Sequence, residues 1–381
     1  MERDLTVLRG EPFASALQEL VDFLSQRRRV FLLGAGCSRC AGLPLTGELT
    51  ELVLKEKSPG VEARKILDAV CARYKRDEPV ATIEDYMSEI VDYLALSQRR
   101  HARGAEDATV KIKGDKFGAD VLASALKQIQ GAVASVIRDR PSRVETHRAF
   151  VKAVHGTLEA GKANQGRCVD YVVLNYDTLI EDALCLERIP MSDGFMGGVT
   201  AWWAPEVYGL DGYRARVVKV HGSIDWWQLE DEDFPRRIRD RVEDLPKSKH
   251  ALIWPCATKY REAQRDPFAL MLGRFREALR AHGEEQCVLT VCGYSFSDAH
   301  INAELEQALR DERRAITLIV LTGAEALPEP LQRWCDDNAI TDQVRVYGAR
   351  VFRHGPQVIE GTEDLPWWRF EELTRLLGGS R

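Results

Sequence analysis

Long apolar runs are missing from this sequence. No segment approaches the roughly 20 apolar residues that a membrane-spanning helix needs, and the first residues, MERD, do not form an apolar signal segment. An excess of positive charge is missing as well, since the formal net charge is −6 at pH 7. We therefore expect a soluble cytoplasmic protein that neither enters a membrane nor uses nucleic acid as its main ligand.

Paired cysteine motifs are also scarce. The chain has 9 cysteines, but only Cys37 and Cys40 form a CxxC pair. A four-cysteine zinc site needs two such pairs, so we expect no metal. Most of the other cysteines lie in apolar strand-like or helical runs, where a reduced thiol packs as a small hydrophobic group. Disulfide bonds are therefore not expected either.

The chain is longer than a usual single domain, at 381 residues. Residues 61–160 have helical periodicity, as in residues 83–94, and contain no convincing strand. We interpret this region as an all-helical insertion with a long loop at residues 101–118. Residues 1–60 and 161–381 then form the main domain.

The main domain alternates apolar runs with helical patterns. This order predicts an α/β fold with a parallel sheet flanked by helices, of the Rossmann type. Short continuous apolar runs are typical of strands that are covered on both faces. The last run is expected at the edge of the sheet. The predicted strands are residues 29–33, 167–174, 215–220, 250–254, 286–292, 315–321 and 344–347.

The first strand ends in a glycine loop with the sequence GAGCS. Gly34 and Gly36 have no Cβ, so a ligand can approach the backbone and its N–H groups. A helical pattern follows from Glu48, and the order of strand, glycine loop and helix is typical of nucleotide binding. Arg39 replaces the third glycine of the dinucleotide fingerprint, so the loop alone is equally compatible with a plain tight turn.

Polar side chains follow the next two predicted strands. Asn175 and Asp177 come after the second strand, and His221 comes after the third. Because the carboxyl ends of parallel strands meet at the edge where α/β sheets bind ligands, we expect these residues near the glycine loop. Each also has a plainer interpretation. Asp177 or Thr178 could cap the following helix, and His221 could be a buried or turn histidine.

Taken together, these motifs resemble the sirtuin family. Sirtuins carry a GAG-S loop, an N-x-D after a buried strand and a His-Gly after another, in this order. The matching residues are Gly34, Ala35, Gly36, Ser38, Asn175, Asp177 and His221. Gly293 and Ser295 stand where a late glycine-serine loop of the family meets the adenosine end of the cofactor. The resemblance covers about residues 25–55 and 165–325.

A closer likeness is to the sirtuin-like NAD-consuming domains of prokaryotic antiphage defence, in which NYDTLIE, HGSIDWW and GYSFSDAHIN recur. The chain departs from deacylating sirtuins in two ways. GLPLTG stands in place of their GIPDFR loop, and the two CxxC pairs of their zinc module are missing after His221. The binding of an acyl-lysine peptide is therefore not expected. Asp298 and Asn302 could cap a helix or contact the ribose.

The resemblance implies an NAD+ glycohydrolase, which cleaves NAD+ as its substrate into nicotinamide and ADP-ribose. Cleavage gives the ribose oxocarbenium character, so the site must hold the pyrophosphate, accommodate nicotinamide and deliver water. Backbone amides of residues 34–38 would hold the phosphates, and Asp177 would receive the nicotinamide carboxamide. Asn175 would position water or the ribose hydroxyls. His221 would act as the base, since the unperturbed pKa of histidine is about 6.5.

Two other functions stay open: an NAD-dependent protein deacylase, and a non-enzymatic scaffold that binds NAD or ADP-ribose. The sequence lacks an ATPase phosphate loop and a recognisable sensor domain, so control by another chain is expected. Stand-alone chains of this kind resemble those paired with a HerA-type ATPase, in which the sirtuin-like chain forms a large homo-oligomer. The resemblance therefore implies an effector of antiphage defence that depletes cellular NAD and meets nucleic acid only through its partner.

Overall fold

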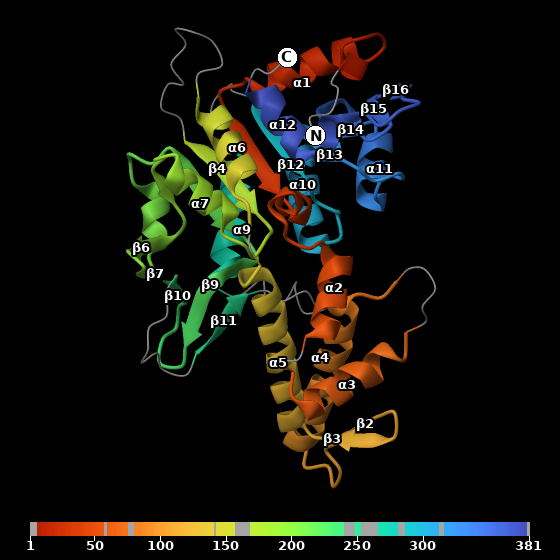
Figure 1. The fold of residues 1–381 in the computed structure, drawn as a ribbon, viewed down its shortest axis with the longest axis vertical. Helices are drawn as coiled ribbons and strands as arrows, with labels where there is room; N and C mark the ends of the chain where they lie inside the picture. Colours follow the sequence, from red (N-terminus) through yellow and green to blue (C-terminus); the bar gives the residue numbers. More distant parts are fainter. Residues whose placement is uncertain are drawn as a thin grey trace. The chain divides into compact units, whose positions relative to one another are not determined.

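The structure of the chain is a computed structural model, shown in Figure 1. It describes residues 6–56, 59–74, 80–140, 142–156, 168–239, 248–252, 266–280, 286–311 and 316–378. The chain divides into two compact units. The sheet unit consists of Met1–Gly42, Ser142–Ala251 and Asp266–Arg381, and the helical unit consists of Leu43–Pro141 and Leu252–Arg265.

The sheet unit is organised around a nine-stranded sheet with the order β16-β15-β14-β13-β12-β1-β4-β8-β5. The pairs from β5 to β14 are all parallel, which confirms the predicted α/β fold. The strands are β1 (Arg29–Leu33), β4 (Val169–Val173), β5 (Met191–Ser192), β8 (Ala215–Lys219), β12 (Cys287–Cys292), β13 (Ile316–Thr322), β14 (Val344–Gly348), β15 (Val351–His354) and β16 (Gln357–Glu360).

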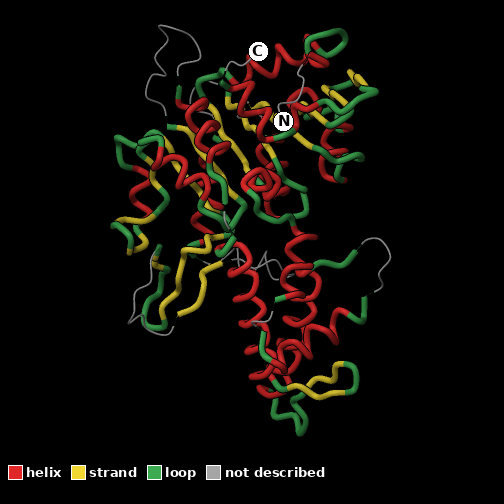
Figure 2. The backbone as a smooth tube through the Cα atoms, in the orientation of Figure 1, coloured by secondary structure: helices red, strands yellow, loops and turns green. Residues whose placement is uncertain are grey.

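Helices cover both faces of this sheet (Figure 2). Side chains of β1 alternate between two cores: Val30 and Leu32 point into one, and Phe31 and Leu33 into the other. Both cores are apolar, so each strand is buried on both sides, as its continuous apolar run requires. One core contains α9 (Phe268–Ala278), α10 (Ala299–Arg310) and α11 (Glu329–Asp336), and the other contains α1 (Ala14–Leu24), α6 (Glu145–His155), α7 (Leu179–Leu186) and α12 (Phe370–Leu377).

The direction of the chain across the sheet reverses at β1. From β1 the chain proceeds to β4 and β8 on one side, and later to β12, β13 and β14 on the other. The order of connections therefore changes direction between β1 and β12, at the carboxyl ends of these two neighbouring strands. Ligands of open α/β sheets bind at such a topological switch point.

Two strand predictions were wrong in their placement. The described part of the run at residues 250–254 is not in the parallel sheet, because β11 (Ser248–Leu252) belongs to a second sheet of order β11-β9-β10-β7-β6; residues 253 and 254 lie outside the described residues. The run at residues 344–347 is not an edge strand, because β15 and β16 extend the sheet beyond β14 through antiparallel hairpins. An apolar run predicts a strand, but it does not say which neighbour the strand will pair with. The other strands of the second sheet are β6 (Phe195–Gly197), β7 (Thr200–Trp203), β9 (Gly222–Leu229) and β10 (Arg236–Ile238).

The described part of the helical unit packs four helices through their apolar stripes. Leu67, Ile90 and Ile129 are fully buried and come from three different helices. Residues 101–118, predicted as a loop, contain the hairpin of β2 (Val110–Ile112) and β3 (Asp115–Phe117), which pair antiparallel around a glycine turn. None of the helices within the described residues is long and apolar enough to cross a bilayer. The four helices are α2 (Thr46–Lys55), α3 (Val61–Cys71), α4 (Ile83–Ala102) and α5 (Ala119–Arg138).

Candidate active site at the carboxyl ends of four strands

Four neighbouring strands end level with one another. Leu33 of β1 pairs with Cys292 of β12 and with Val173 of β4, and Val173 pairs in turn with Lys219 of β8. The residues that follow these four positions are therefore carried to the same edge of the sheet. They include the glycine loop, the Asn-x-Asp segment, His221 and the loop after β12, so the sheet brings together the segments that the sequence motifs single out.

The glycine loop packs backbone against backbone on the loop after β12. Gly34 N–H donates to the Cys292 carbonyl at 2.9 Å, and Gly36 N–H donates to the Gly293 carbonyl at 2.9 Å. A Cβ on Gly36 would lie 2.6 Å from Gly293 Cα, and a Cβ on Gly293 would lie 2.5 Å from Cys37 N. Gly293 also has a φ of 67°, which favours glycine. Close contact within the protein, rather than ligand approach alone, therefore explains these glycines.

The loop itself folds as a short 3₁₀ helix, η2 (Ala35–Ala41). The two thiols of the CxxC pair lie here, and both donate to backbone carbonyls at 3.2 Å: Cys37 to Cys292, and Cys40 to Cys37. Burial raises the pKa of Cys40 to about 12 and raises that of Cys37 as well. Both groups are therefore neutral thiols at pH 7, which is the opposite of what a reactive or metal-binding cysteine needs.

Asn175 is held against the glycine loop. Its Nδ2 donates to the Gly34 carbonyl at 3.0 Å and to Ser38 Oγ at 2.7 Å. A carbonyl can only accept, so this contact assigns the amide orientation, with Nδ2 facing the loop and Oδ1 on the other side. Ser38 is buried, and its hydroxyl donates a hydrogen bond to Asp177 Oδ2 at 2.7 Å. Asn175 is thus a fixed side chain whose remaining polar atom is an acceptor.

Asp177 contacts the start of α7, the helix that follows it. Its Oδ1 accepts from the backbone N–H of Leu179 at 3.1 Å, while its Oδ2 accepts from Ser38. The Thr178 hydroxyl instead donates a hydrogen bond to Asp182 at 2.7 Å. Asp177 thus satisfies the first N–H of α7 from the position before the N-cap residue, Thr178, which makes no side-chain cap hydrogen bond. A carboxylate has about four acceptor positions, so these two hydrogen bonds leave capacity for a ligand N–H.

A buried lysine supports the same segment and was not singled out from the sequence. Lys219 is 1% exposed, and its Nζ donates to the backbone carbonyl of Asp177 and lies 3.5 Å from Glu181 Oε1. Desolvation raises the pKa of Glu181 to about 7, and the nearby Lys219 charge only partly opposes this shift. The signal in the sequence was a lysine inside an apolar strand, where a charge is costly unless it is paired.

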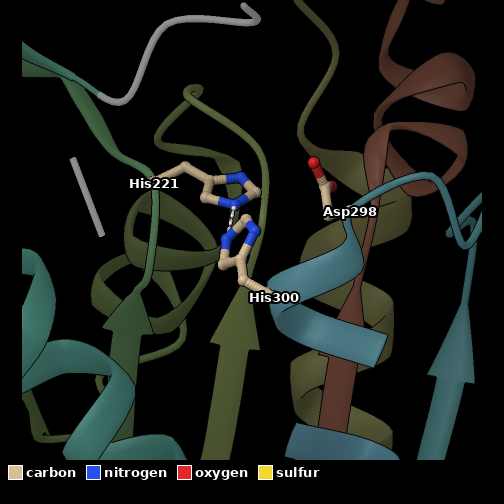
Figure 3. A group of neighbouring side chains, drawn as sticks. All are labelled: His221, Asp298 and His300. Atoms are coloured by element: carbon tan, nitrogen blue, oxygen red, sulfur yellow. Dashed lines mark hydrogen bonds between the residues drawn. The ribbon is translucent and has the colours of Figure 1, made fainter. Parts of the chain in front are cut away.

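His221 lies in contact with a second histidine (Figure 3). Its Nδ1 is 3.3 Å from the Leu174 carbonyl, and its Nε2 is 3.1 Å from Nε2 of His300. Both rings are 4% exposed. Since the Leu174 carbonyl can only accept, the contact at Nδ1 needs a proton on that nitrogen, and the contact between the two Nε2 atoms needs a proton on one of them. His300 was not singled out from the sequence, although it follows Asp298 by two positions in GYSFSDAHIN.

The loop after β12 is braced from inside. Asn302 donates to the Phe296 carbonyl at 2.8 Å, and its Oδ1 accepts from the Tyr294 hydroxyl at 3.0 Å. Asn302 therefore holds the loop that precedes α10. Ser295 is exposed on this loop, with its Oγ 2.9 Å from Ser297 Oγ. It lies on the surface, where it can be reached by a ligand.

Within the described residues, one group of side chains could hold a metal ion. It consists of His221, Asp298 and His300, whose ligand atoms lie within 4.8 Å of one another. All three are buried, and histidine nitrogen with carboxylate oxygen is a donor set that suits zinc. Figure 3 shows the two imidazoles facing each other, with the Asp298 carboxylate standing apart from their contact. The cysteine pattern, on which we based the expectation of no metal, contains no information about this group.

Residues 170–341 match the family model of the SIR2-like domain. The matched range begins in β4 and includes Asn175, His221 and His300, whereas the glycine loop lies outside it. No curated protein matches the chain.

Several solved structures of Sir2 homologues are similar to this chain at low identity. A crystal structure of a Sir2 homologue in complex with NAD is 14% identical, with a TM-score of 0.41, over 95% of this chain and 93% of that chain. A variant of a Sir2 homologue in complex with ADP-ribose is 13% identical, with a TM-score of 0.39, over 95% of this chain and 97% of that chain. Another variant, with 2′-O-acetyl ADP-ribose, is 13% identical, with a TM-score of 0.36, over 81% of this chain and 86% of that chain.

Proposed function

We propose that this chain is an NAD+ glycohydrolase, which converts NAD+ and water into nicotinamide and ADP-ribose. The observation that carries the proposal is the fixed amide of Asn175, which lies at the switch point of the sheet between the glycine loop and the histidine pair. The match of residues 170–341 to the SIR2-like domain supports it further. The motifs that resemble sirtuins meet at this edge.

The chemistry requires a preorganised acceptor beside the ribose. As the bond between nicotinamide and ribose breaks, positive charge develops on the ribose, and a water molecule must attack the same carbon. Asn175 makes two hydrogen bonds to the loop with its Nδ2, so its Oδ1 is held in place to accept from a water or a ribose hydroxyl. This side chain needs no reorganisation during the reaction, which is how a neutral amide can contribute to the rate.

The neighbouring residues supply the other functions. We propose that amides of η2, where Ala35 is exposed, contact the pyrophosphate, and that Gly293 and Ser295 line the adenosine end. Asp177 would accept from the nicotinamide carboxamide with an acceptor position that its two observed hydrogen bonds do not use. His221 would take the proton that the attacking water releases. No step in this scheme requires a metal.

The experiment that tests the proposal follows the products of NAD+ by chromatography, with and without an acyl-lysine peptide. Nicotinamide and ADP-ribose should appear without the peptide. Asn175→Ala should reduce turnover about 10²–10⁴-fold, because it removes the fixed acceptor, and His221→Ala should do the same. Asn175→Asp is the matched control, since it keeps the acceptor oxygen but loses the donor to Gly34.

Two results would contradict the proposal. Strict dependence on the peptide would point to the deacylase. Intact NAD+ in the presence of an activating partner, together with tight binding of ADP-ribose, would point to the scaffold. Circular dichroism of each variant distinguishes a loss of chemistry from a loss of folding.

We also propose that this activity serves antiphage defence by depleting NAD in the cytoplasm, under the control of a HerA-type ATPase and within a homo-oligomer. The support is the resemblance of the NYDTLIE, HGSIDWW and GYSFSDAHIN motifs to such proteins. The insertion at residues 61–160 is the largest segment that the NAD chemistry does not need, so it is the proposed contact region. Light scattering of the purified chain, alone and with the ATPase, tests this. A monomer in both samples would contradict it.

A further inference from the structure

We propose that His221, His300 and Asp298 form a binding site for one zinc ion, and that the bound ion inhibits the proposed hydrolysis of NAD+. The inhibition rests on the proposed function, whereas the site itself does not. The basis of the proposal is that three buried side chains, whose ligand atoms lie within 4.8 Å of one another, converge at one edge of the sheet. His221 follows β8, and the other two residues stand at the start of α10, which follows β12 on the other side of β1.

The two imidazoles already face each other as two ligands of one ion do. Nε2 of His221 lies 3.1 Å from Nε2 of His300, and Figure 3 shows the two rings meeting through these nitrogens. On a tetrahedral zinc ion with Zn–N bonds of about 2.0–2.1 Å, two ligand nitrogens stand about 3.3–3.4 Å apart. The rings therefore need to separate by only a few tenths of an ångström to coordinate the same ion.

The surroundings of His221 match those of a metal-binding histidine. Its Nδ1 lies 3.3 Å from the Leu174 carbonyl, which can only accept, so Nε2 is the nitrogen that is left to coordinate. A ligating histidine commonly donates its other ring N–H to a carbonyl or a carboxylate, because this contact fixes the orientation of the ring. The structure thus supplies both the ligand nitrogen of His221 and the acceptor that supports it.

Asp298 supplies the third ligand and a negative charge. Its backbone N–H donates to the Tyr294 hydroxyl at 3.2 Å, and Asn302 braces the same loop by donating to the Phe296 carbonyl at 2.8 Å, so the backbone of Asp298 is fixed. The side chain is 8% exposed, and in Figure 3 its carboxylate stands apart from the contact between the imidazoles. We expect a rotation of this side chain to close the site, because a doubly charged ion attracts a buried carboxylate strongly.

The donor set favours zinc, and the place of the ion explains the inhibition. Imidazole nitrogen suits zinc, whereas magnesium and calcium prefer oxygen ligands. Three protein ligands leave the fourth position of a tetrahedral zinc ion to water. A zinc ion on Nε2 of His221 occupies the lone pair that this residue needs in order to take a proton from water. Zinc and the proposed hydrolysis therefore compete for one nitrogen.

The first experiment measures zinc binding itself. The full chain, freed of metal by a chelator, is titrated with zinc in a calorimeter, and we expect one ion per chain with a Kd of about 1 μM or lower. His300→Phe removes one ligand nitrogen and should weaken binding at least about 100-fold, since the loss of a supporting contact alone typically costs about 10- to 100-fold. Asp298→Asn removes the charge at nearly constant shape and should weaken binding about 10- to 100-fold.

Matched variants separate this site from other zinc ligands. His101→Phe removes an exposed histidine of α4, and Cys40→Ser removes a thiol of the CxxC pair, so both should bind zinc as the wild type does. A wild type that binds no zinc, equal affinity in the wild type, His300→Phe and Asp298→Asn, or a loss of binding in Cys40→Ser would each overturn the proposed site. If circular dichroism shows that His300→Phe does not fold, Asp298→Asn decides.

The second experiment measures inhibition. Zinc added to the NAD+ assay should lower the turnover of the wild type with a midpoint equal to the Kd from calorimetry, and a chelator should restore it. For Asp298→Asn, measured against its own zinc-free rate, the midpoint should shift by the same factor as its Kd. Unchanged or faster turnover with zinc bound would contradict the inhibition. If the wild type does not hydrolyse NAD+ at all, the proposed function fails, while the calorimetry still decides the zinc site.

Discussion

The sheet unit and the helical unit bury different kinds of side chain. In the described part of the helical unit, the buried polar side chains are Thr50 and Ser97, and each hydroxyl donates to a backbone carbonyl, of Thr46 and of Ala108. The sheet unit buries histidines, carboxylates and a lysine, including His221, His300, Asp177, Glu181 and Lys219. Removing such groups from water is costly unless each one is paired.

The comparison shows where the chain tolerates the cost of burying ionisable side chains. The described part of the helical unit buries apolar stripes and two hydrogen-bonded hydroxyls. No histidine or charged side chain is buried in that part. In the sheet unit, buried ionisable groups lie at the carboxyl ends of β4 and β8, next to the candidate site. Perturbed ionisable groups gather at functional sites because the chemistry needs them there. The two units should therefore respond differently to substitution and to pH.

The largest effect on stability is expected at the contact between the two loops of the site. Gly36→Ala places a Cβ 2.6 Å from Gly293 Cα. The atoms that this Cβ meets belong to the backbone, which cannot rotate out of the way as a side chain can. We expect the free energy of unfolding to fall by about 3 kcal/mol, as in an overpacked core. Urea denaturation measures this. Gly47→Ala in α2, where no atom lies within 4 Å of the new Cβ, is the control and should not destabilise.

A smaller effect should appear in the pH dependence of the sheet unit. Burial in the folded state raises the pKa of Glu181 from 4.5 to about 7. As pH rises, the unfolded chain therefore loses the Glu181 proton at a lower pH than the folded chain does. The stability contributed by the protonated carboxyl is full below about pH 4.5 and is lost as pH passes 7.

Glu181→Gln removes this dependence. Relative to the variant, the wild type should lose about 2 kcal/mol of unfolding free energy between pH 4.5 and 8, a conservative figure for a shift of this size at about 1.36 kcal/mol per pKa unit. Denaturation curves at both pH values test it. A constant difference between the two proteins across this range would show that Glu181 remains ionised beside Lys219.

The smallest effect is expected in the helical unit, and it has the opposite sign. Gly131 lies inside α5, and a Cβ added there meets no atom within 4 Å. Gly131→Ala should therefore raise the unfolding free energy by about 0.5–1 kcal/mol, because alanine loses less backbone entropy in a helix. Calorimetry of the purified chain measures this. A loss of stability, or a change in the oligomeric state, would instead show that this face of α5 is covered when the chain assembles.

Much of the site could be predicted because it is encoded locally. Asn175, Asp177 and the glycine loop stand directly after apolar runs that form β4 and β1, and parallel strands place their carboxyl ends at one edge. His300 could not be found in this way, because it lies 79 positions from His221 and follows a strand on the other side of β1. The apolar run of β11 likewise predicted a strand, but not the sheet in which it pairs.

By itself, the sequence determined the α/β class, most strands of the parallel sheet and the polar residues at their ends, because hydrophobic periodicity and glycine act within a few residues. Only the tertiary structure decided the strand order, and with it three contacts: Gly36 against Gly293, Lys219 against Glu181, and His221 against His300. Each of these contacts joins segments that are distant in the chain. Its existence depends on which strands become neighbours, and that is settled by packing over the whole sheet.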